Sequence, residues 1–441
     1  MRNPFARHTL PVLAGGLLLA LLAACGGGGS DPAGSSAAPS PSAAATEAAE
    51  PTSPVEISFA SWVGEQDGMK RLYAKFKQEH PNITVKFQNV PAEELETKLT
   101  AQIAGGNPPD AAYMDAGGVA TFASRDALVN LDGYIAGSKV VKLDDYVPAF
   151  KAFTTSNGSM YGLPFDGEST GLFYRKDMFE AAGITEPPKT WDEFKAAAEK
   201  LTDPAKKQYG FAVFAPEAEY YWYPWLFQNG GSLLSEDEKT VEFNNEAGKE
   251  AGRYYVDLVK YAPPDYLNSN SYDARVAFAN GQVGMYMAGA WFAGTLSDEF
   301  PKIEGKWATA PLPDGKAGCK TTIAGDALVM FGDSEKQDAT WKWLEFLSQP
   351  ENIAEWTFKS EGTLLPPLTS LLTSPELVQE KPVLEGFAKL MECGVNYNIV
   401  NEEWPKISEE LNKQLGAAMF GDQTADEALD NTATFAQRYV R

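Results

Sequence analysis

The sequence predicts an α/β fold divided into two lobes, and three observations lead to this prediction. Between residues 55 and 118, segments with strand-like alternation take turns with segments of helical periodicity, the order that builds a parallel sheet. A similar alternation restarts after residue 194. The chain has 441 residues, which is too long for one simple core, so two lobes are expected.

The first lobe is predicted to begin with alternating strands and helices. Strands are expected at 55–60, 83–87 and 111–114, and helices at 66–79 and across Leu95, Leu99 and Ile103, the second ended by Gly105-Gly106. In a parallel sheet, ligands bind at the carboxyl ends of the strands. Trp62, Gln66 and Asp115 fall at such ends and are therefore candidate ligand residues.

The stretch from Tyr161 to Phe194 is the centre of the prediction. Its short apolar strands at 163–165 and 171–174 enclose Asp166-Gly167-Glu168. In extended backbone, the two carboxylates point to the same side, which would place both at one site. An ordinary polar turn between the strands is the alternative.

The second half continues the mixture of helices and strands. Thr190 is expected to cap a helix, with Glu193 reaching back to the free amide at its start. Strands are then expected at 211–214 and 283–287, a long apolar run at 319–331, and helices at 246–261, at 272–280 and toward the C-terminus.

Some aromatic residues lie in sequence patterns that packing in a core does not explain. The run 220–225 has five aromatic residues among six, which cannot all face one core, so Tyr220, Tyr221 and Trp222 are candidate ligand residues. Trp291 lies shortly after Gly289, where its ring can face a cleft. Aromatic rings stack on the apolar faces of sugars, while carboxylates accept hydrogen bonds from hydroxyls.

Composition excludes several classes of function. The 60 acidic residues against 37 basic ones argue against nucleic acid as the main ligand. The two histidines are His8 and His80, so a histidine-rich metal site is excluded and no metal is expected. Cys319 and Cys393 are expected to form a disulfide in an oxidising space, although the sequence does not show their geometry.

The N-terminus predicts the compartment. An apolar run at 10–24, short and rich in glycine for a membrane span, ends in small residues followed by Cys25. This arrangement resembles the lipobox of bacterial lipoproteins, which implies a signal peptide at 1–24 and a lipid on Cys25. A plain secretory signal with an incidental cysteine is the alternative. Residues 25–53 are expected to be a flexible tether, so the protein would lie outside the cytoplasmic membrane, held by its lipid alone.

Four motifs then point to a known family. They are GGNPPDAAYMDAGG (105–118), YGLPFDGESTGLFYRKDMFEAAGITEPPKTWDEF (161–194), FANGQVGMYMAGAW (278–291) and GDQTADEAL (421–429). In this order they resemble the extracellular solute-binding proteins of ABC importers, in the sugar-binding family that includes maltose-binding protein. The resemblance implies a two-lobe, type II periplasmic-binding-protein-like fold, with a ligand cleft between lobes joined by a hinge of several crossings.

The resemblance also implies the boundaries of the lobes. One lobe would take residues 54–165 with 326–372, and the other would take 168–322 with 376–441. Cys319 and Cys393 would then share a lobe, so a disulfide between them would not lock the hinge.

Roles for individual residues follow from the same resemblance. Glu168 would take sugar hydroxyls with Asp166 beside it, and Trp291 would stack on a sugar ring. The family's other ligand positions fall on Trp62, on Tyr220 or Tyr221, and, in a loose alignment, on Trp404. Gln66-Asp67 replaces the maltose binder's acid-base pair and Met114 replaces a tryptophan, which argues against maltodextrin and leaves a small saccharide as the expected ligand.

The function implied is equilibrium binding coupled to closure of the lobes. The closed monomer would dock on a membrane permease whose partner ATPase hydrolyses ATP, since this chain has no phosphate loop, and no cofactor is expected. Two alternatives stay open. The same fold could bind a peptide, polyamine or metal chelate, or the chain could be a glycoside hydrolase that uses Asp166 and Glu168.

Overall fold

The computed structural model describes residues 45–440, apart from 214–217, 236, 266–272, 360–361, 398, 400 and 402. Contacts group Ala43–Arg441 into one unit. The predicted signal peptide and Cys25 lie outside the described residues, as do Phe214 and Tyr272 of the predicted strand and helix.

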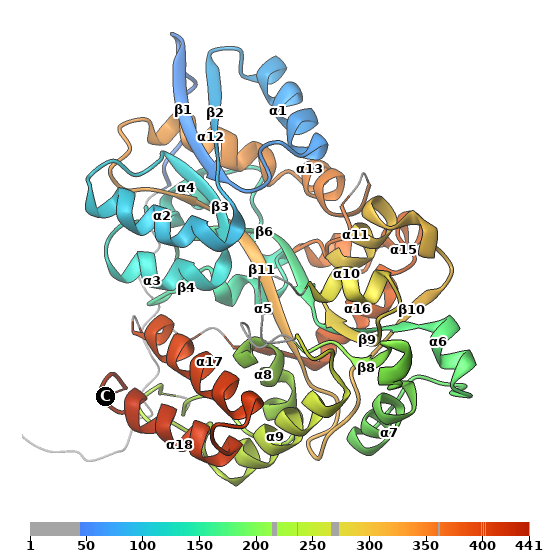
Figure 1. The fold of residues 1–441 in the computed structure, drawn as a ribbon. Coiled ribbons are helices and arrows are strands. Elements are labelled where there is room, and N and C mark those ends of the chain that lie inside the picture. The colour runs from blue at the N-terminus through green and yellow to red at the C-terminus, as the bar shows by residue number, and fades with distance from the viewer. Residues whose placement is uncertain are drawn as a thin grey trace, which may run out of the picture. The chain divides into compact units, whose positions relative to one another are not determined.

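The first sheet begins with the predicted strand–helix–strand order. Strands β1 (Val55–Ser61) and β2 (Ile83–Asn89) pair in parallel, and β3 (Ala111–Asp115) pairs in parallel with β1 on its other side. Helices α1 (Asp67–Glu79) and α2 (Ala92–Ala104) make the connections (Figure 1). The prediction for this part of the chain is therefore confirmed, with bounds that differ by one to three residues.

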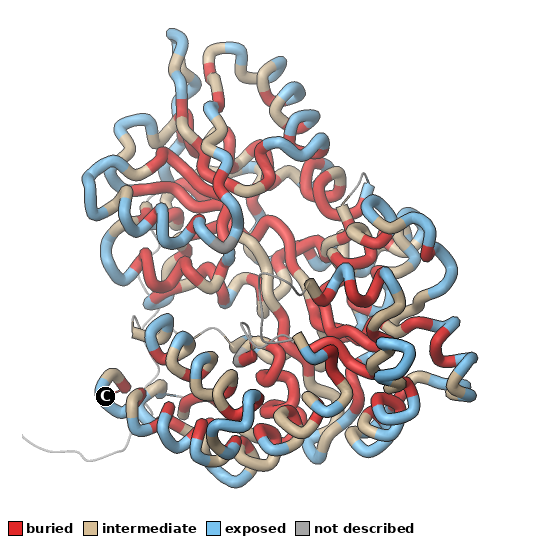
Figure 2. Tube along the Cα trace, viewed as in Figure 1, coloured by how far each residue is buried: buried red, intermediate tan, exposed pale blue. Residues whose placement is uncertain are grey.

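Alternation along β1 separates two apolar clusters, one on each face of the first sheet. Ile57 and Phe59 face a cluster with α1, where Met69, Leu72 and Phe76 are buried at helical spacing. Ala60 faces the opposite cluster, to which α2 contributes Leu95 and Leu99. Figure 2 shows the buried strands running between the partly exposed helices.

Two long strands extend beyond this sheet and position the site. Strand β6 (Gly162–Ser169) pairs antiparallel with β11 (Thr321–Met330), which also pairs with β3. The register shifts between Asp326 and Ala327, so one extra residue of β6 is accommodated as a bulge. Asp166-Gly167-Glu168 therefore lies in extended backbone, which confirms that interpretation over the turn.

The second sheet has the order β10-β7-β9-β8. Strand β7 (Gly171–Arg175) follows β6 after one residue and pairs antiparallel with β9 (Val283–Ala288) and β10 (Trp307–Ala310), while β8 (Tyr209–Phe211) is parallel to β9. A large cluster, separate from the two on the first sheet, packs on this sheet and is called the second core below. The exact lobe boundaries stay a prediction.

The remaining elements surround the two sheets. Near the first are α3 (Val119–Ser124), α4 (Asp132–Gly137), α5 (Pro148–Phe153), β4 (Thr155–Ser156), β5 (Ser159–Met160), α12 (Gln337–Leu347), α13 (Pro350–Ala354) and α14 (Thr369–Leu372). Strand β12 (Gly394–Asn396) belongs to the first sheet itself, beside β11, and β4 pairs with β5 as a separate two-stranded sheet. The others are α6 (Lys176–Ala181), α7 (Trp191–Leu201), α8 (Ala218–Gln228), α9 (Glu246–Asp257), α10 (Ala274–Ala279), α11 (Trp291–Glu299), α15 (Pro375–Glu380), α16 (Leu384–Leu390), α17 (Trp404–Phe420) and α18 (Ala425–Ala436).

Helix α7 begins with the two side-chain bonds of its prediction. The Thr190 hydroxyl accepts from the Glu193 amide, and the Glu193 carboxylate reaches back to accept from the amide of Lys189, at 2.7 Å, one residue before the N-cap. Both bonds satisfy amides at the start of the helix.

The expected flexibility of residues 25–53 is wrong for the end of that segment. The amide of Thr46 donates to the carbonyl of Gly133 in α4, and the amide of Ala49 donates to Asp338 in α12. A Cβ on Gly137 would lie 2.2 Å from the Thr46 carbonyl oxygen, so this glycine permits the close approach. The last part of the predicted tether thus packs on the first lobe.

The predicted disulfide between Cys319 and Cys393 is confirmed, with their Cα atoms 5.6 Å apart. The parallel pairing of β11 with β12 aligns Thr321 with Gly394, so Cys393 lies one residue and Cys319 two residues before it. The disulfide therefore joins the beginnings of two adjacent strands.

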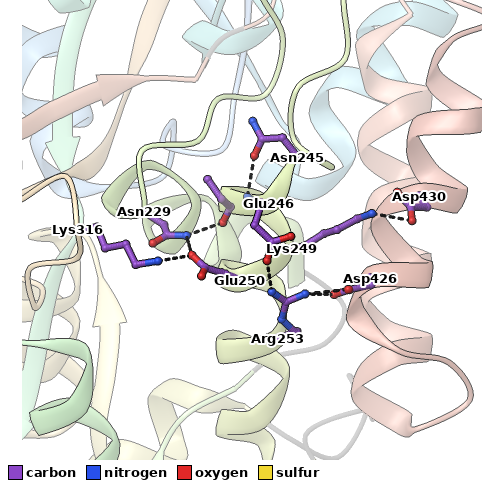
Figure 3. A network of polar contacts seen from close by, with 11 residues as sticks. Asn229, Asn245, Glu246, Lys249, Glu250, Arg253, Lys316, Asp426 and Asp430 are labelled. Carbon is purple, nitrogen blue, oxygen red and sulfur yellow. Dashed lines mark hydrogen bonds and ion pairs between the residues drawn. The ribbon is translucent and has the colours of Figure 1, made fainter.

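Ion pairs connect α9 to the C-terminal helix α18 (Figure 3). Lys249 contacts Asp430 at 2.8 Å and Arg253 contacts Asp426 at 2.8 Å. A single exposed ion pair of this kind contributes little to the free energy of folding. Together these pairs link two helices that also share an apolar interface.

Candidate functional site

A cleft of about 900 Å³ lies where the carboxyl ends of the first sheet meet β6, β11 and α11. Its lining comes from distant parts of the sequence: Trp62, Gln66 and Asp67 after β1; Tyr113 and Asp115 of β3; Asp166, Gly167 and Glu168 of β6; Gly325 and Asp326 of β11; and Trp291, Thr295 and Asp298 of α11.

Six of the ten predicted ligand residues line this cleft. They are Trp62, Gln66, Asp115, Asp166, Glu168 and Trp291. Trp62, Gln66 and Asp115 were predicted because they follow or end strands. They lie together in the cleft because β1 and β3 are parallel neighbours, so their carboxyl ends are at the same edge of the sheet. Their contact with a ligand stays a prediction.

The aromatic run lies elsewhere, and the reasoning about it was wrong. Residues 220–225 fall within helix α8, where Tyr221 is 6% exposed and Trp222 is fully buried in the second core. The run can be buried because its helix is surrounded by apolar side chains rather than packed along one face. Trp222 therefore supplies core packing instead of a cleft surface.

Two further predicted residues lie behind or outside the lining. The Tyr220 hydroxyl is 3.5 Å from Oε1 of Glu168, so Tyr220 supports a cleft residue without lining the cleft itself. The Tyr221 hydroxyl lies 3.0 Å from that of Tyr286 in the second core. Trp404 begins α17 and packs partly buried against the same core, outside the lining.

Asp166 is the buried centre of a polar network on β6, the strand that leads from the first sheet to β7 of the second. Its Oδ2 accepts hydrogen bonds from the Tyr113 hydroxyl at 2.9 Å and from the Trp356 indole nitrogen at 2.7 Å. The Tyr113 hydroxyl also lies 2.6 Å from Oδ2 of Asp326. Because a hydroxyl has a single hydrogen, it cannot donate to both carboxylates at once.

Burial controls the protonation of this pair. It raises the pKa of Asp166 to about 6, although the donors Trp356 and Tyr113 act in the opposite direction. The pKa of Asp326 is raised well above its ordinary value, first by burial and then by the negative charges of Asp166 and Asp115. The buried pair therefore holds a proton more readily than two isolated carboxylates would.

Glu168 faces the cleft with its pKa raised to about 7. Burial is the largest cause, followed by the charges of Asp115 and Asp166, while hydrogen bonds from Tyr220 and Trp291 lower it. The side chain therefore changes charge near neutral pH.

Asp115 ends β3 with its side chain accessible from the cleft. Its Oδ1 accepts from the Gly117 amide at 2.6 Å, which caps the short 3-10 helix after the strand. The surrounding groups exclude water from this carboxyl, and the loss of hydration raises its pKa. The bond to Gly117 acts in the opposite direction.

Two tryptophans provide aromatic surface from separate elements. Trp62 packs edge-on against Tyr113, with ring centroids 4.7 Å apart, and Trp291 packs edge-on against Phe292 at 5.8 Å. Both indoles stay partly exposed in the cleft. Aromatic faces beside carboxylate acceptors suit a ligand with apolar C–H faces and many hydroxyl groups.

Sequence reasoning missed Tyr113, Asp326 and Trp356. Asp326 was visible as a single acid within the apolar run at 319–331, which is a signal for a functional or paired group. Tyr113 had been assigned to a strand and Trp356 to a helical run, and nothing in one sequence shows that their polar ends meet Asp166.

No group of three or more histidine, cysteine or acidic side chains among the described residues is placed to hold a metal ion. Across the same residues, none of the helices has the length and apolar character needed to cross a bilayer.

A family of bacterial extracellular solute-binding proteins matches residues 60–354 of this chain. The chain belongs to this family. The match contains β6 and β11, the cleft carboxylates and both cleft tryptophans.

Individual relatives agree with this assignment. A putative binding protein of Brucella abortus is 27% identical over 83% of this chain and 88% of its own length. An ABC transporter solute-binding protein of Thermotoga lettingae, solved with α-D-tagatose, has a TM-score of 0.80 and 26% identity, over 88% of this chain and all of that one. The GacH receptor of Streptomyces glaucescens, solved unliganded and with acarbose, has a TM-score of 0.78 and 28% identity, over 87% of this chain and 98% of that one.

Proposed function

We propose that this protein captures a small saccharide or polyol outside the cytoplasmic membrane and delivers it to an ABC permease, without catalysing a reaction. The main observation is the cleft, which combines exposed faces of Trp62 and Trp291 with the carboxylates of Asp115 and Glu168. The solved relatives with tagatose and acarbose support a ligand rich in hydroxyl groups.

The crossing strands supply a mechanism for closure. Besides β11, a further segment pairs with β6: the amide of Gly167 donates to the carbonyl of Leu365, and the amide of Leu365 donates to the carbonyl of Gly167, both at 2.8 Å. A ligand that contacts Trp62 on one lobe and Trp291 on the other would favour the closed form. The closed face would then be recognised by the permease.

The structure offers less support for a glycoside hydrolase. Asp166 is 1% exposed, and its Oδ2 already accepts hydrogen bonds from Tyr113 and Trp356. A catalytic acid or nucleophile has to reach the substrate. We therefore propose that Asp166 fixes the hinge and that Glu168 binds the ligand.

The remaining parts of the proposal concern the chain's surroundings. Cys25 would receive a lipid after removal of residues 1–24, and the lipid would be the sole attachment of a monomeric binding protein to the membrane. The permease, with its ATPase on the cytoplasmic side, would supply the energy.

The test is a thermal-shift and calorimetric screen of the purified protein against mono-, di- and oligosaccharides and polyols. Binding should raise the free energy of unfolding by about 2.7 kcal/mol at a hundred times the dissociation constant. Trp291→Ala should abolish the shift, and Trp404→Ala, outside the cleft, should keep it. A screen without any shift, or turnover of an oligosaccharide or aryl glycoside, would overturn the proposal.

A further inference from the structure

The lining of the cleft has many more acidic than basic residues. Its acidic lining residues are Glu65, Asp67, Asp115, Asp166, Glu168, Asp298 and Asp326, whereas the described part of the lining contains a single basic residue, Arg275. Arg275 is already neutralised by Asp273, which its guanidinium contacts through two hydrogen bonds of 2.8 and 3.1 Å. The positive charge of the cleft therefore does not balance its carboxylates.

The inner carboxylates lack a cationic partner. Among the described residues, the hydrogen-bond donors to Asp115, Asp166 and Glu168 are backbone amides, tyrosine hydroxyls, indoles and the carboxyl of Asp326, and none of them is a cation. Glu65, at the rim, differs because Lys70 lies 3.2 Å from it. The inner carboxylates instead repel one another, as shown by the contributions of Asp115 and Asp166 to the raised pKa of Glu168.

A neutral sugar would leave this repulsion in place. Hydroxyl groups need hydrogen-bond acceptors, but they do not need an excess of negative charge. A protonated amine would offset the repulsion and would form charge-assisted hydrogen bonds, which are stronger than neutral ones. The faces of Trp62 and Trp291 also attract cations. A metal ion is not indicated, since the described residues place no group of three ligands together.

We propose that the cleft selects an aminated saccharide or aminated polyol, with its ammonium group between Glu168 and Asp115 and its carbon skeleton against Trp62 and Trp291. The cleft is the binding site, and its carboxylates favour a ligand that carries a positive charge. This inference rests on the proposed function and narrows it to a class of ligand.

The test compares matched ligands by isothermal titration calorimetry with the purified full chain. The pairs are 1-amino-1-deoxyglucitol with glucitol, 1-amino-1-deoxymannitol with mannitol, and 1-amino-1-deoxymaltitol with maltitol, because the primary amines of these polyols stay protonated at about pH 8. At about pH 8, the amine of at least one pair should bind about tenfold tighter than its neutral partner. If the neutral partner binds equally or better in every pair, the inference fails while the proposed function stands. If neither partner binds in any pair but the screen above finds another, neutral ligand, the inference fails alone; if the screen also finds no ligand, the proposed function fails with it.

The dependence on pH and salt gives a second readout. Because Glu168 and Asp166 become protonated toward about pH 5, the advantage of the amine should shrink there, and binding near neutral pH should release protons. High salt should weaken the amine more than its neutral partner. An advantage that is unchanged at low pH would overturn the placement of the ammonium group beside these carboxylates.

Two variants test the residues named. Glu168→Gln and Asp115→Asn should remove the difference between partners, and asparagine at 115 can still cap the following turn through its side-chain oxygen. Asp422→Asn, exposed and outside the cleft, is the matched control and should keep the difference. Thermal unfolding without ligand shows whether each variant is folded, and a difference retained by both cleft variants would overturn the inference.

Discussion

Gly289 lies directly against the carboxylate of Glu168. A Cβ placed on Gly289 would come within 2.0 Å of Oε2, closer than any real contact of these atoms. Gly289 directly follows β9 and is separated from Trp291, the first residue of α11, by Ala290 alone, so the segment that presents the tryptophan also determines where the glutamate can lie.

Gly289→Ala should weaken ligand binding by about tenfold or more, because the new methyl group displaces a charged acceptor. The effect on unfolding should be small if Glu168 can rotate into the cleft. Calorimetric titration with the ligand from the screen measures the change. Gly386→Ala is the matched control, since a Cβ there has no neighbour within 4 Å and Gly386 lies in α16. A variant at 289 with unaltered affinity would mean that Glu168 does not contact the ligand.

Glu168→Gln should stabilise the unliganded protein at high pH. The pKa of Glu168 is raised from 4.5 to about 7, so folding favours its protonated form. This contribution to stability is complete below about pH 4.5 and is lost as the pH rises through about 7. Glutamine imitates the neutral form, so the variant should match the wild type at about pH 4 and exceed it by on the order of 1–2 kcal/mol at pH 8, allowing for partial exposure.

Urea unfolding at both pH values measures this difference. Glu427→Gln is a control that should show the opposite dependence of stability on pH, because hydrogen bonds from Thr424 lower the pKa of Glu427. That variant should lose stability relative to the wild type as the pH rises. An identical pH dependence for both variants would contradict the environment assigned to Glu168.

The sequence predicted the parts of the fold that local patterns determine. Periodicity located β1, α1 and β3, and the rule about carboxyl ends of parallel strands brought Trp62 and Asp115 to the cleft. The disulfide was predicted from composition and compartment rather than from geometry. These inferences succeed because each depends on a short segment or on a count.

The failures depend on packing between distant segments. Five aromatic residues in six could not be recognised as a core helix, because burial of α8 requires neighbours from both sides that the local sequence does not show. Likewise, the contact of Tyr113 with Asp326 joins residues 213 positions apart. The hydrogen bonds of Thr46 and Ala49 to the first lobe were not predicted, because the composition of residues 25–53 is typical of linkers.

Trp356→Phe should destabilise the protein in a pH-dependent way. The variant removes the indole donor to Asp166 but can keep the stacking on Phe165, whose ring centroid lies 5.7 Å away. The loss should be about 1–3 kcal/mol at pH 8, where Asp166 is ionised, and smaller at about pH 5, below its pKa of about 6.

Trp343→Phe is the matched control, since its buried indole nitrogen has no hydrogen-bond partner among the described residues. It should lose packing alone, with the same cost at both pH values. Denaturant unfolding of the two variants distinguishes them. Equal and pH-independent losses would show that the bond from Trp356 to Asp166 does not contribute to stability.

Reduction of the Cys319–Cys393 disulfide should lower stability without lowering affinity. The cross-link spans 74 residues, so its loss should cost about 2–4 kcal/mol through the freedom gained by the unfolded chain. Neither cysteine lines the cleft, and both precede strands that stay paired through β11 and β12. The double variant Cys319→Ser/Cys393→Ser should therefore unfold at a lower urea concentration while binding the ligand with the wild-type dissociation constant. A loss of affinity in a folded variant would instead mean that the disulfide sets the position of β11, and with it Asp326 at the cleft.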